Sequence, residues 1–289
     1  MSFDILFFTH LLNGLIMMFF PIGIAIYLTR KFKQGWRLFW IGGFTFIASQ
    51  VFHIPFNNWF FSLGIIPRGS STGMMVIPAL ALGLSAGLFE EIARYIVYRW
   101  WAKDARSWSK GLLLGIGHGG MEAILLGLLV LVNFLYLAAY RGQDLTRLFP
   151  PDQLALAQQQ ISAYWAIPWY GTLLGAVERI FAVTIQISLS ILVLQAFTRR
   201  NIIWLVFAIL WHTIVDASAV YVLPVWGAHI AEGIVAILAV LSLGIIFILR
   251  QPEAPEPPQE ELPPLKPASI VPIEVDDTPE SLQNSRFNE

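Results

Sequence analysis

The chain has 289 residues, of which 56% are hydrophobic and only 13% are charged, and its mean hydropathy is +0.65. This composition excludes an ordinary soluble globular domain and is typical of a membrane protein with several spans. The sequence contains no cysteine, which excludes disulfides, thiolate metal sites and a cysteine nucleophile. The basic residues lie in short gaps between apolar runs, a pattern of membrane topology, so no nucleic-acid partner is expected.

Seven apolar runs are each long enough to cross about 30 Å of hydrocarbon as a helix. They predict spans over 5–28, 36–54, 75–98, 110–137, 169–197, 201–221 and 226–249. We therefore expect an all-α fold, a polytopic helical bundle embedded in a lipid bilayer. The gap from Pro55 to Gly73 begins with aromatic residues and is expected to dip into the membrane interface. Pro151 and Asp152 open a segment that reads either as a short surface helix or as a polar loop.

The Lys and Arg residues in the gaps are distributed unevenly between the two sides of the predicted membrane. Eleven lie on one side, and only Arg68, Arg141 and Arg147 lie on the other. The positive-inside rule then predicts an outside N-terminus and a cytoplasmic C-terminus. Residues 1–250 form the predicted transmembrane domain. Residues 251–289 are rich in Pro and Glu, which predicts a disordered acidic cytoplasmic tail because few apolar side chains are available to bury.

Charged and imidazole side chains interrupt four of the predicted spans. These side chains are Glu90, Glu91, Arg94, His118, Glu122, Glu178, Arg179, His212 and Asp216. One charge at the bilayer centre costs roughly 2.5–3.5 kcal/mol on insertion scales. The side chains are therefore expected to meet one another or to line a wet cavity.

Helical spacing brings several of these residues to one level. His118 and Glu122 are four residues apart and share a helix face. The same spacing relates His212 and Asp216, and it predicts an ion pair between Glu90 and the arginine one turn later. Counted at 1.5 Å per residue, Glu90, His118 and His212 lie about 12–17 Å from the cytoplasmic ends of their spans. Two histidines and three or four carboxylates are thus predicted at a similar depth.

Other polar residues in the spans are interpreted as structural. Those assigned to packing or interhelical hydrogen bonds are His10, His53, His229 and Glu232. Glu178 and Arg179 are sequence neighbours, which predicts that they point to different faces and that each pairs with another helix.

The glutamate and histidine side chains suit the hydrolysis of a peptide bond. A carboxylate shielded from bulk water acts as a general base on a water molecule, and imidazoles hold that water or donate to the oxyanion. Glu90, His118 and His212 are also a ligand set for Zn²⁺ with an open position, and zinc is the cofactor that this set suggests. No H-E-x-x-H motif is present, which excludes a zincin-type site. Metal-free and metal-assisted hydrolysis both remain open at this point.

These motifs resemble those of a known group of proteins. The three patterns are Glu90-Glu91-x-x-Arg94, Leu114-x-x-x-His118 and His212-x-x-x-Asp216. They are similar to the double-Glu, aromatic-x-x-x-His and His-x-x-x-Asn/Asp motifs of the CAAX-protease and bacteriocin-processing intramembrane endopeptidases and their PrsW-like relatives. The arginine comes one residue early and a leucine replaces the aromatic residue. The GHGGME segment at 117–122 and the Glu178-Arg179 pair resemble most the YhfC-type family of intramembrane peptidases, over about residues 1–250.

The resemblance implies an enzyme, an intramembrane protease that cleaves a membrane-embedded or membrane-delivered peptide or protein. The implied site residues are Glu90, Glu91, Arg94, His118, His212 and Asp216, to which helical spacing adds Glu122. The first glutamate would activate water, and the rest of its motif would position it. Both histidines would stand around the water or the oxyanion, and the acid after the second histidine would orient it.

Two other functions suit the same residues. A proton- or ion-coupled transporter would use an acid–histidine chain as a relay, although the inverted repeat and broken helices typical of transporters are not evident in the sequence. A non-catalytic membrane scaffold would keep the polar residues for packing alone. In each case the expected location is the plasma membrane of a prokaryote.

Overall fold

A computed structural model describes residues 4–64 and 72–252. Within these ranges the chain is helical and contains no strand. Seven helical stretches are long and apolar enough to cross a membrane, which confirms the predicted all-α bundle with seven spans. Arg68 and residues 253–289 of the predicted tail lie outside the described residues.

The spans differ from the predicted ones by a few residues at most of their ends. The long helices are α1 (Ile5–Lys31), α2 (Arg37–Ser62), α3 (Val76–Ile96), α4 (Trp108–Tyr140), α6 (Leu174–Thr198), α7 (Ile203–Trp226) and α8 (Ala228–Ile248). The shorter elements are η1 (Thr72–Met75), the π-helical turn η2 (Val97–Trp101), η3 (Leu145–Arg147), α5 (Pro151–Trp165) and η4 (Gly171–Leu173).

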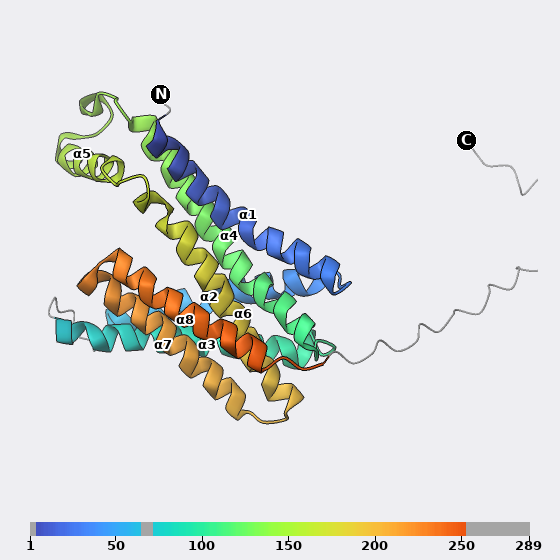
Figure 1. Ribbon diagram of the computed structural model, residues 1–289. Helices are drawn as coiled ribbons and strands as arrows, with labels where there is room; N and C mark the ends of the chain where they lie inside the picture. Colours follow the sequence, from blue (N-terminus) through green and yellow to red (C-terminus); the bar gives the residue numbers. More distant parts are fainter. Residues whose placement is uncertain (1–3, 65–71, 253–289) are drawn as a thin grey trace, which may run out of the picture. The chain divides into compact units, whose positions relative to one another are not determined.

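Helix α5 confirms the short helix predicted at Pro151, and the alternative of a polar loop is wrong. A proline in the first turn suits a helix start because its missing N–H would have no intrahelical partner there. Asp152 in the same turn interacts favourably with the positive end of the helix dipole. No residue of α5 is buried, and the helix lies at one end of the bundle (Figure 1).

Helix α2 is longer than predicted. It continues through Pro55 to Ser62, so Trp59 and the two phenylalanines that follow it belong to the helix. The prediction that the chain leaves the span at Pro55 is therefore wrong. A proline removes one backbone donor, but a transmembrane helix tolerates it because neighbouring groups satisfy the freed backbone.

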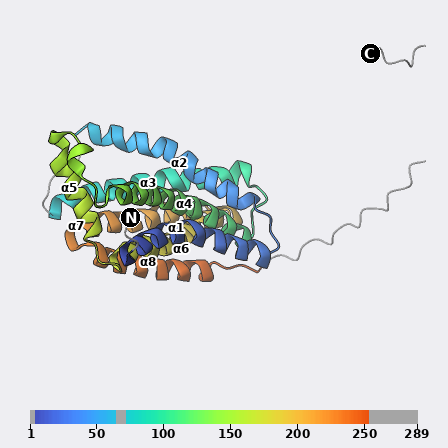
Figure 2. The same cartoon turned by 90° about the horizontal axis from the view of Figure 1, so that it is seen from above.

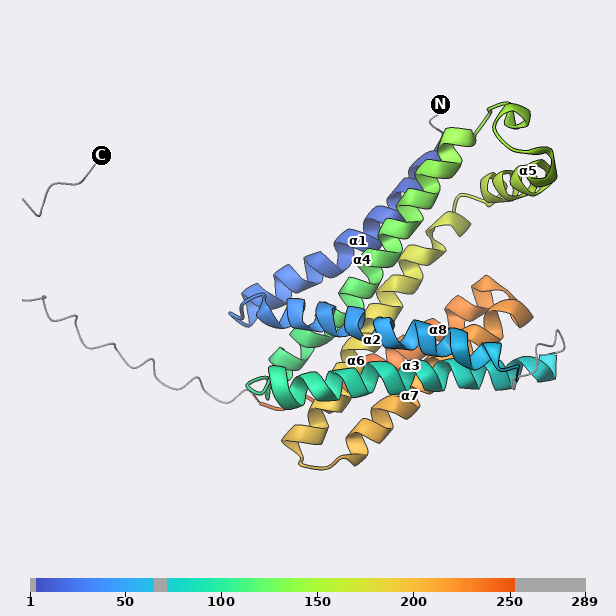
Figure 3. The same cartoon turned by 180° about the vertical axis from the view of Figure 1, so that it is seen from behind.

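The helices form two groups that cross. Helix α4 packs against α1, α2 and α6, whereas α3 packs along α7, and α6 and α7 both contact α8. In Figures 1 and 3, α1, α4 and α6 lean together, while α2 and α3 run side by side at a different tilt; Figure 2 shows the same helices from above. The polar residues of α3, α4, α6 and α7 lie where the two groups cross.

Glycines on α4 allow the close crossing at this point. A Cβ atom added to Gly117 would lie 2.1 Å from the Phe39 carbonyl oxygen of α2, and one added to Gly119 would lie 2.6 Å from Gln186 Cβ of α6. Small residues let helix backbones approach closely in membranes, where packing drives association. His118, between these two glycines, is thereby fixed between α2 and α6.

Candidate active site

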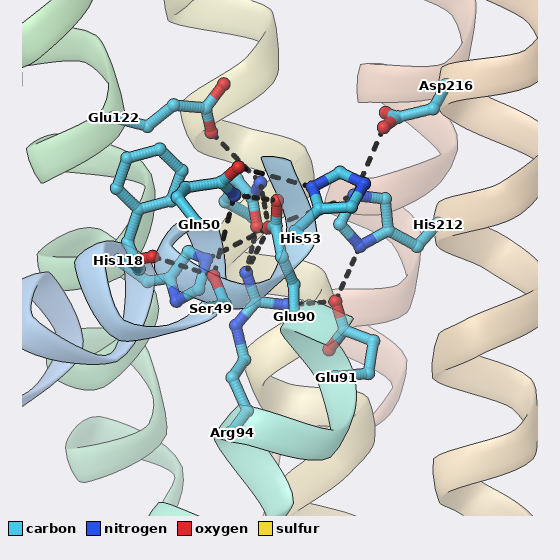
Figure 4. A network of polar contacts seen from close by, with 12 residues as sticks. Ser49, Gln50, His53, Glu90, Glu91, Arg94, His118, Glu122, His212 and Asp216 are labelled. Carbon is cyan, nitrogen blue, oxygen red and sulfur yellow. Dashed lines mark hydrogen bonds and ion pairs between the residues drawn. The ribbon is translucent and has the colours of Figure 1, made fainter. Parts of the chain in front are cut away.

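Three of the predicted site residues, from three helices, meet around one carboxylate oxygen. Nε2 of His118, on α4, lies 3.0 Å from Oε2 of Glu90, on α3. Nε2 of His212, on α7, lies 3.9 Å from the same oxygen. Figure 4 shows Glu90 between the two imidazoles. None of the three side chains is more than 7% exposed, so the carboxylate points into the bundle and not toward lipid.

Glu91 orients the second histidine. Its Oε1 atom lies 2.7 Å from Nδ1 of His212, which donates to it when Nδ1 carries the proton. That hydrogen bond leaves Nε2 of His212 facing Glu90. The structure thus gives Glu91 the hydrogen bond to His212 that the resemblance implied for Asp216. Oδ2 of Asp216 lies 3.5 Å from the other ring nitrogen, Nε2.

Arg94 is fully buried and balances the two glutamates. Its guanidinium forms an ion pair and a hydrogen bond with Glu91, donates to Oε1 of Gln186, and lies 3.8 Å from Oε2 of Glu90. The predicted pair with Glu90 is present, but Glu91 is the closer partner. With ionised carboxylates and neutral imidazoles, the five residues Glu90, Glu91, Arg94, His118 and His212 carry a net charge of −1. We call these five residues the Glu90 cluster.

Two amide side chains that the sequence analysis did not identify hold Glu90 in place. Nε2 of Gln50, on α2, donates to Oε1 of Glu90 at 2.9 Å, and Nε2 of Gln186, on α6, donates to Oε2 at 3.3 Å. A neutral amide costs less in lipid than a charge, so it is less conspicuous in an apolar sequence. The signal that could have found them is a glutamine inside an apolar span, since such side chains hydrogen-bond across helices.

His53 is connected to the candidate site through one intervening side chain. Its Nδ1 atom is 3.2 Å from Oε1 of Gln50, and its Nε2 atom is 3.1 Å from Oγ of Ser85 on α3. The interhelical hydrogen bond predicted for this histidine is therefore present. Because Gln50 also contacts Glu90, His53 is connected to the Glu90 cluster through that amide (Figure 4).

The other two membrane histidines lie away from the Glu90 cluster. The ring of His10 stacks on that of Tyr164, with centroids 4.2 Å apart. The ring of His229 lies 6.3 Å from that of Tyr170. Neither histidine has an ion pair or hydrogen bond to the Glu90 cluster among the contacts of the described residues.

Glu122, Glu178 and Arg179 form a second cluster, the Arg179 cluster. Nη1 of Arg179 donates to Oε1 of Glu122 at 2.6 Å, which confirms that the arginine pairs with another helix. The hydrogen bonds and the ion pair of Glu178 among the described residues are with Arg179 of the same helix. The predictions that these neighbours point to different faces and that Glu178 pairs with another helix are therefore wrong. Their long side chains bend toward each other. Nε2 of Gln186 also donates to Oε2 of Glu122 at 3.0 Å, which joins this cluster to Glu90.

An apolar groove of about 680 Å³ lies between α2 and α3, beside the Glu90 cluster. Ser49 and Phe89 line the groove, whereas the residues that follow them, Gln50 and Glu90, hydrogen-bond to each other. Helix α3 therefore presents apolar side chains to the groove and charged ones to the cluster. Phe52, on the groove wall of α2, is 68% exposed, so the groove opens to the outside of the bundle.

The donor atoms of Glu90, His118 and His212 have the chemistry that zinc prefers, a carboxylate oxygen and two imidazole nitrogens. Donors in a tetrahedral zinc site with bonds of about 2.0–2.1 Å lie roughly 3.3 Å apart. The distances of 3.0 and 3.9 Å from Glu90 fall on either side of that value. The hydrogen bond from His212 to Glu91 is also one that zinc-binding histidines usually make. Among residues 4–64 and 72–252, however, no group of three such side chains already stands as a metal site.

Comparison with known proteins agrees with the resemblance of the motifs. Residues 16–239 match the family model described as "YhfC intramembrane metalloprotease". The chain is 32% identical over 237 residues to a Bacillus subtilis (strain 168) protein described as "Uncharacterized membrane protein YhfC", and the alignment covers 80% of this chain and 92% of that relative. No solved structure matches the chain. The chain therefore belongs to the YhfC intramembrane metalloprotease family.

Proposed function

We propose that this protein is an intramembrane endopeptidase in which Glu90 activates a water molecule. The observation that supports this proposal is the position of Glu90 Oε2, 3.0 Å from His118 Nε2 and 3.9 Å from His212 Nε2. A general base acts on a water within hydrogen-bond reach. A water placed off the line between Glu90 and His212 reaches both atoms at about 2.8 Å.

In the proposed reaction, Glu90 removes a proton from the water as the water oxygen bonds to the peptide carbonyl carbon. The carbonyl oxygen becomes negative, and the N–H of His118 is a nearby donor to that charge. Glu90 then returns the proton to the peptide nitrogen as the C–N bond breaks. The products are a new carboxyl terminus and a new amino terminus, and no oxidant or reductant is needed.

The family description points to a metal, and Glu90, His118 and His212 are the residues that would hold it. A zinc ion would supply Lewis-acid polarisation of the substrate carbonyl. The remaining members of the Glu90 cluster have the same tasks with or without the ion. Glu91 orients His212, and Arg94 offsets the negative charge of the two carboxylates.

We further propose that the substrate is a membrane-embedded peptide or protein whose apolar segment lies in the α2–α3 groove. The groove is apolar, opens outward, and adjoins Glu90 through Ser49 and Phe89. The distribution of Lys and Arg supports an outside N-terminus. The plasma membrane of a prokaryote is the proposed location.

The proposal is tested by Glu90→Gln, with Glu232→Gln as the matched control. Glu232 is a membrane glutamate on α8 that belongs to neither cluster. Purified protein in lipid nanodiscs is incubated with a library of transmembrane peptides, with and without added Zn²⁺, and the products are identified by mass spectrometry. The wild type and Glu232→Gln should cleave the same bonds at similar rates, whereas Glu90→Gln should be slower by about a hundredfold or more.

Two results would contradict the proposal. One is the absence of cleavage by the wild type under every condition. The other is unchanged cleavage by Glu90→Gln. If uptake into proteoliposomes driven by a pH gradient were then observed, the transporter function would take its place.

A further inference from the structure

A small cavity lies between the two charged clusters. Its volume is about 70 Å³, which is enough for roughly two to four water molecules. Its polar lining consists of the Arg179 cluster, His212 of the Glu90 cluster, and Gln186 and Asp216. Water needs two to four polar partners to occupy a buried site, and this lining supplies them.

One face of α6 follows the cavity toward Glu90. Glu178, Ala182 and Gln186 all line the cavity and recur every fourth residue, so they lie on the same face of the helix. Glu178 is in the second turn of α6, at the end of the span that follows α5. Gln186 lies about 12 Å deeper along the helix axis. Since Gln186 donates to both Glu122 and Glu90, this face leads from the end of the span to the proposed base.

On α6, α4 and α3 the exposure of the acidic side chains falls toward Glu90, whereas Asp216, on the α7 wall of the cavity, is 38% exposed. The side chain of Glu178 is 34% exposed, that of Glu122 is 19% exposed, and that of Glu90 is 7% exposed. Acidic side chains at membrane depth face the bundle interior or a water-filled cavity, because lipid does not solvate them. The two most exposed acids, Glu178 and Asp216, both line the cavity, so the cavity is the wet side of the buried Glu90 carboxylate.

We propose that this cavity is the passage through which water reaches Glu90, and that it is separate from the apolar α2–α3 groove. The Arg179–Glu122 ion pair joins α6 to α4 at the wall of the passage. Gln186 hydrogen-bonds to Glu122 and to Glu90, so it is the lining residue that connects the passage to the proposed base. The inference rests on the proposed function, because hydrolysis consumes one water for each bond cleaved.

Cysteine labelling tests the passage without any need for activity. The chain has no cysteine of its own, so single cysteines give no background. Ala182→Cys on α6 and Ala219→Cys on α7 place a thiol in the cavity, and Ala48→Cys places one in the apolar groove as the control. Ag⁺ is close to a water molecule in size and binds thiolates, which need water around them; a cysteine that Ag⁺ has reached is then protected from alkylation after the protein is unfolded. In nanodiscs, which expose both membrane faces, the cavity cysteines should react about tenfold faster or more than Ala48→Cys.

Cavity cysteines that react no faster than Ala48→Cys would overturn the inference. The labelling test and the cleavage test have independent outcomes. Fast labelling of a protein that cleaves no peptide would support the water passage and contradict the peptidase proposal. Slow labelling of a protein that does cleave would contradict the passage alone.

A second pair of variants tests whether the passage limits catalysis. Ala182→Leu and Ala219→Leu each add three carbons to the cavity wall, so they should lower kcat and leave KM for an apolar peptide unchanged. Ala139→Leu, on an exposed position of α4, is the matched control and should change neither constant. Normal kcat in both cavity variants would contradict the passage.

Discussion

The two charged clusters of the bundle have similar charges and different surroundings. In each, two carboxylates face one guanidinium. In the Glu90 cluster, two imidazoles are added and no side chain is more than 7% exposed. In the Arg179 cluster, the acids are 19% and 34% exposed and the three residues include no histidine. Only the first combines deep burial with imidazoles, which offer both a hydrogen-bond donor and an acceptor.

The clusters also differ in the number of buried polar atoms that have no hydrogen-bond partner. Oε2 of Glu91, Nε of Arg94 and Nδ1 of His118 are buried without a hydrogen-bond partner among residues 4–64 and 72–252. No buried side-chain atom of Glu122, Glu178 or Arg179 is in that position. Since buried polar groups are nearly always paired, unused capacity marks a place for a water, an ion or a substrate. Oε2 of Glu232 and Nε2 of His10 are single atoms in the same position, so the Glu90 cluster is set apart by three such atoms beside buried charge and two imidazoles.

Removal of an imidazole should produce the largest effect that separates the clusters. His118→Ala removes the donor to Glu90 and should lower kcat by about a hundredfold or more. The matched control is His229→Ala. This variant removes a membrane histidine that lies beside the Tyr170 ring and belongs to neither cluster. Rates are measured on the best peptide from the library. Equal rates for both variants would mean that the Glu90 cluster has no special part in cleavage.

Loss of one acid from each cluster should reveal the difference in burial. Glu91→Gln leaves Arg94 without its closest charged partner in a fully buried position and should lower the free energy of unfolding by about 3–5 kcal/mol. Glu178→Gln breaks a partly exposed pair and should cost no more than about 1 kcal/mol. Both are measured by denaturant unfolding in mixed micelles. Similar losses in the two variants would contradict the contrast.

The close helix crossing that supports the Glu90 cluster should be sensitive to one methyl group. Gly117→Ala brings a Cβ atom into the Phe39 backbone and should lower the free energy of unfolding by about 1–3 kcal/mol. Gly244→Ala on α8 is the matched control, because a Cβ atom there meets nothing within 4 Å. Thermal unfolding of the two variants gives the comparison. A Tm for Gly117→Ala equal to that of Gly244→Ala would show that the crossing is looser than the structure indicates.

An ion pair outside the spans should show the smallest effect. Hydrogen bonds from Arg141 and from the backbone N–H of Phe7 lower the pKa of Asp4 from 3.8 to about 2. A lowered folded-state pKa contributes stability above the unfolded-state pKa, and that contribution is lost as pH falls through the folded value. Asp4→Asn should therefore have a slightly lower Tm than the wild type at neutral pH, with the difference shrinking as pH falls from 3.8 toward 2. A difference that grows in acid would contradict this pairing.

Most of the fold could be predicted because each membrane span is a long run of apolar residues, which hydropathy detects. The last helix was predicted over 226–249 and is observed as Ala228–Ile248. Pro55 was misread because a proline ends many soluble helices, whereas a membrane helix continues through it when its neighbours satisfy the backbone. Glu178 and Arg179 were misread because helical spacing describes where Cβ atoms point and not where long flexible side chains end.

The charged members of the candidate site stood out because lipid penalises them, and the structure brings Glu90, His118 and His212 together. Gln50 and Gln186 did not stand out, because a neutral amide carries a smaller penalty. Which nitrogen of a histidine meets which acid depends on the rotation of neighbouring helices about their axes. Spacing along one helix does not contain that information.

The most direct test of the central claim is peptide cleavage in water enriched in the heavy oxygen isotope. If Glu90 activates water against the peptide carbonyl, the label should enter the new carboxyl terminus of the wild-type product. Glu90→Gln should form about a hundredfold less labelled product, or even less, over the same time. Labelled product formed by Glu90→Gln at the wild-type rate, or fragments of the wild type without label, would contradict the account.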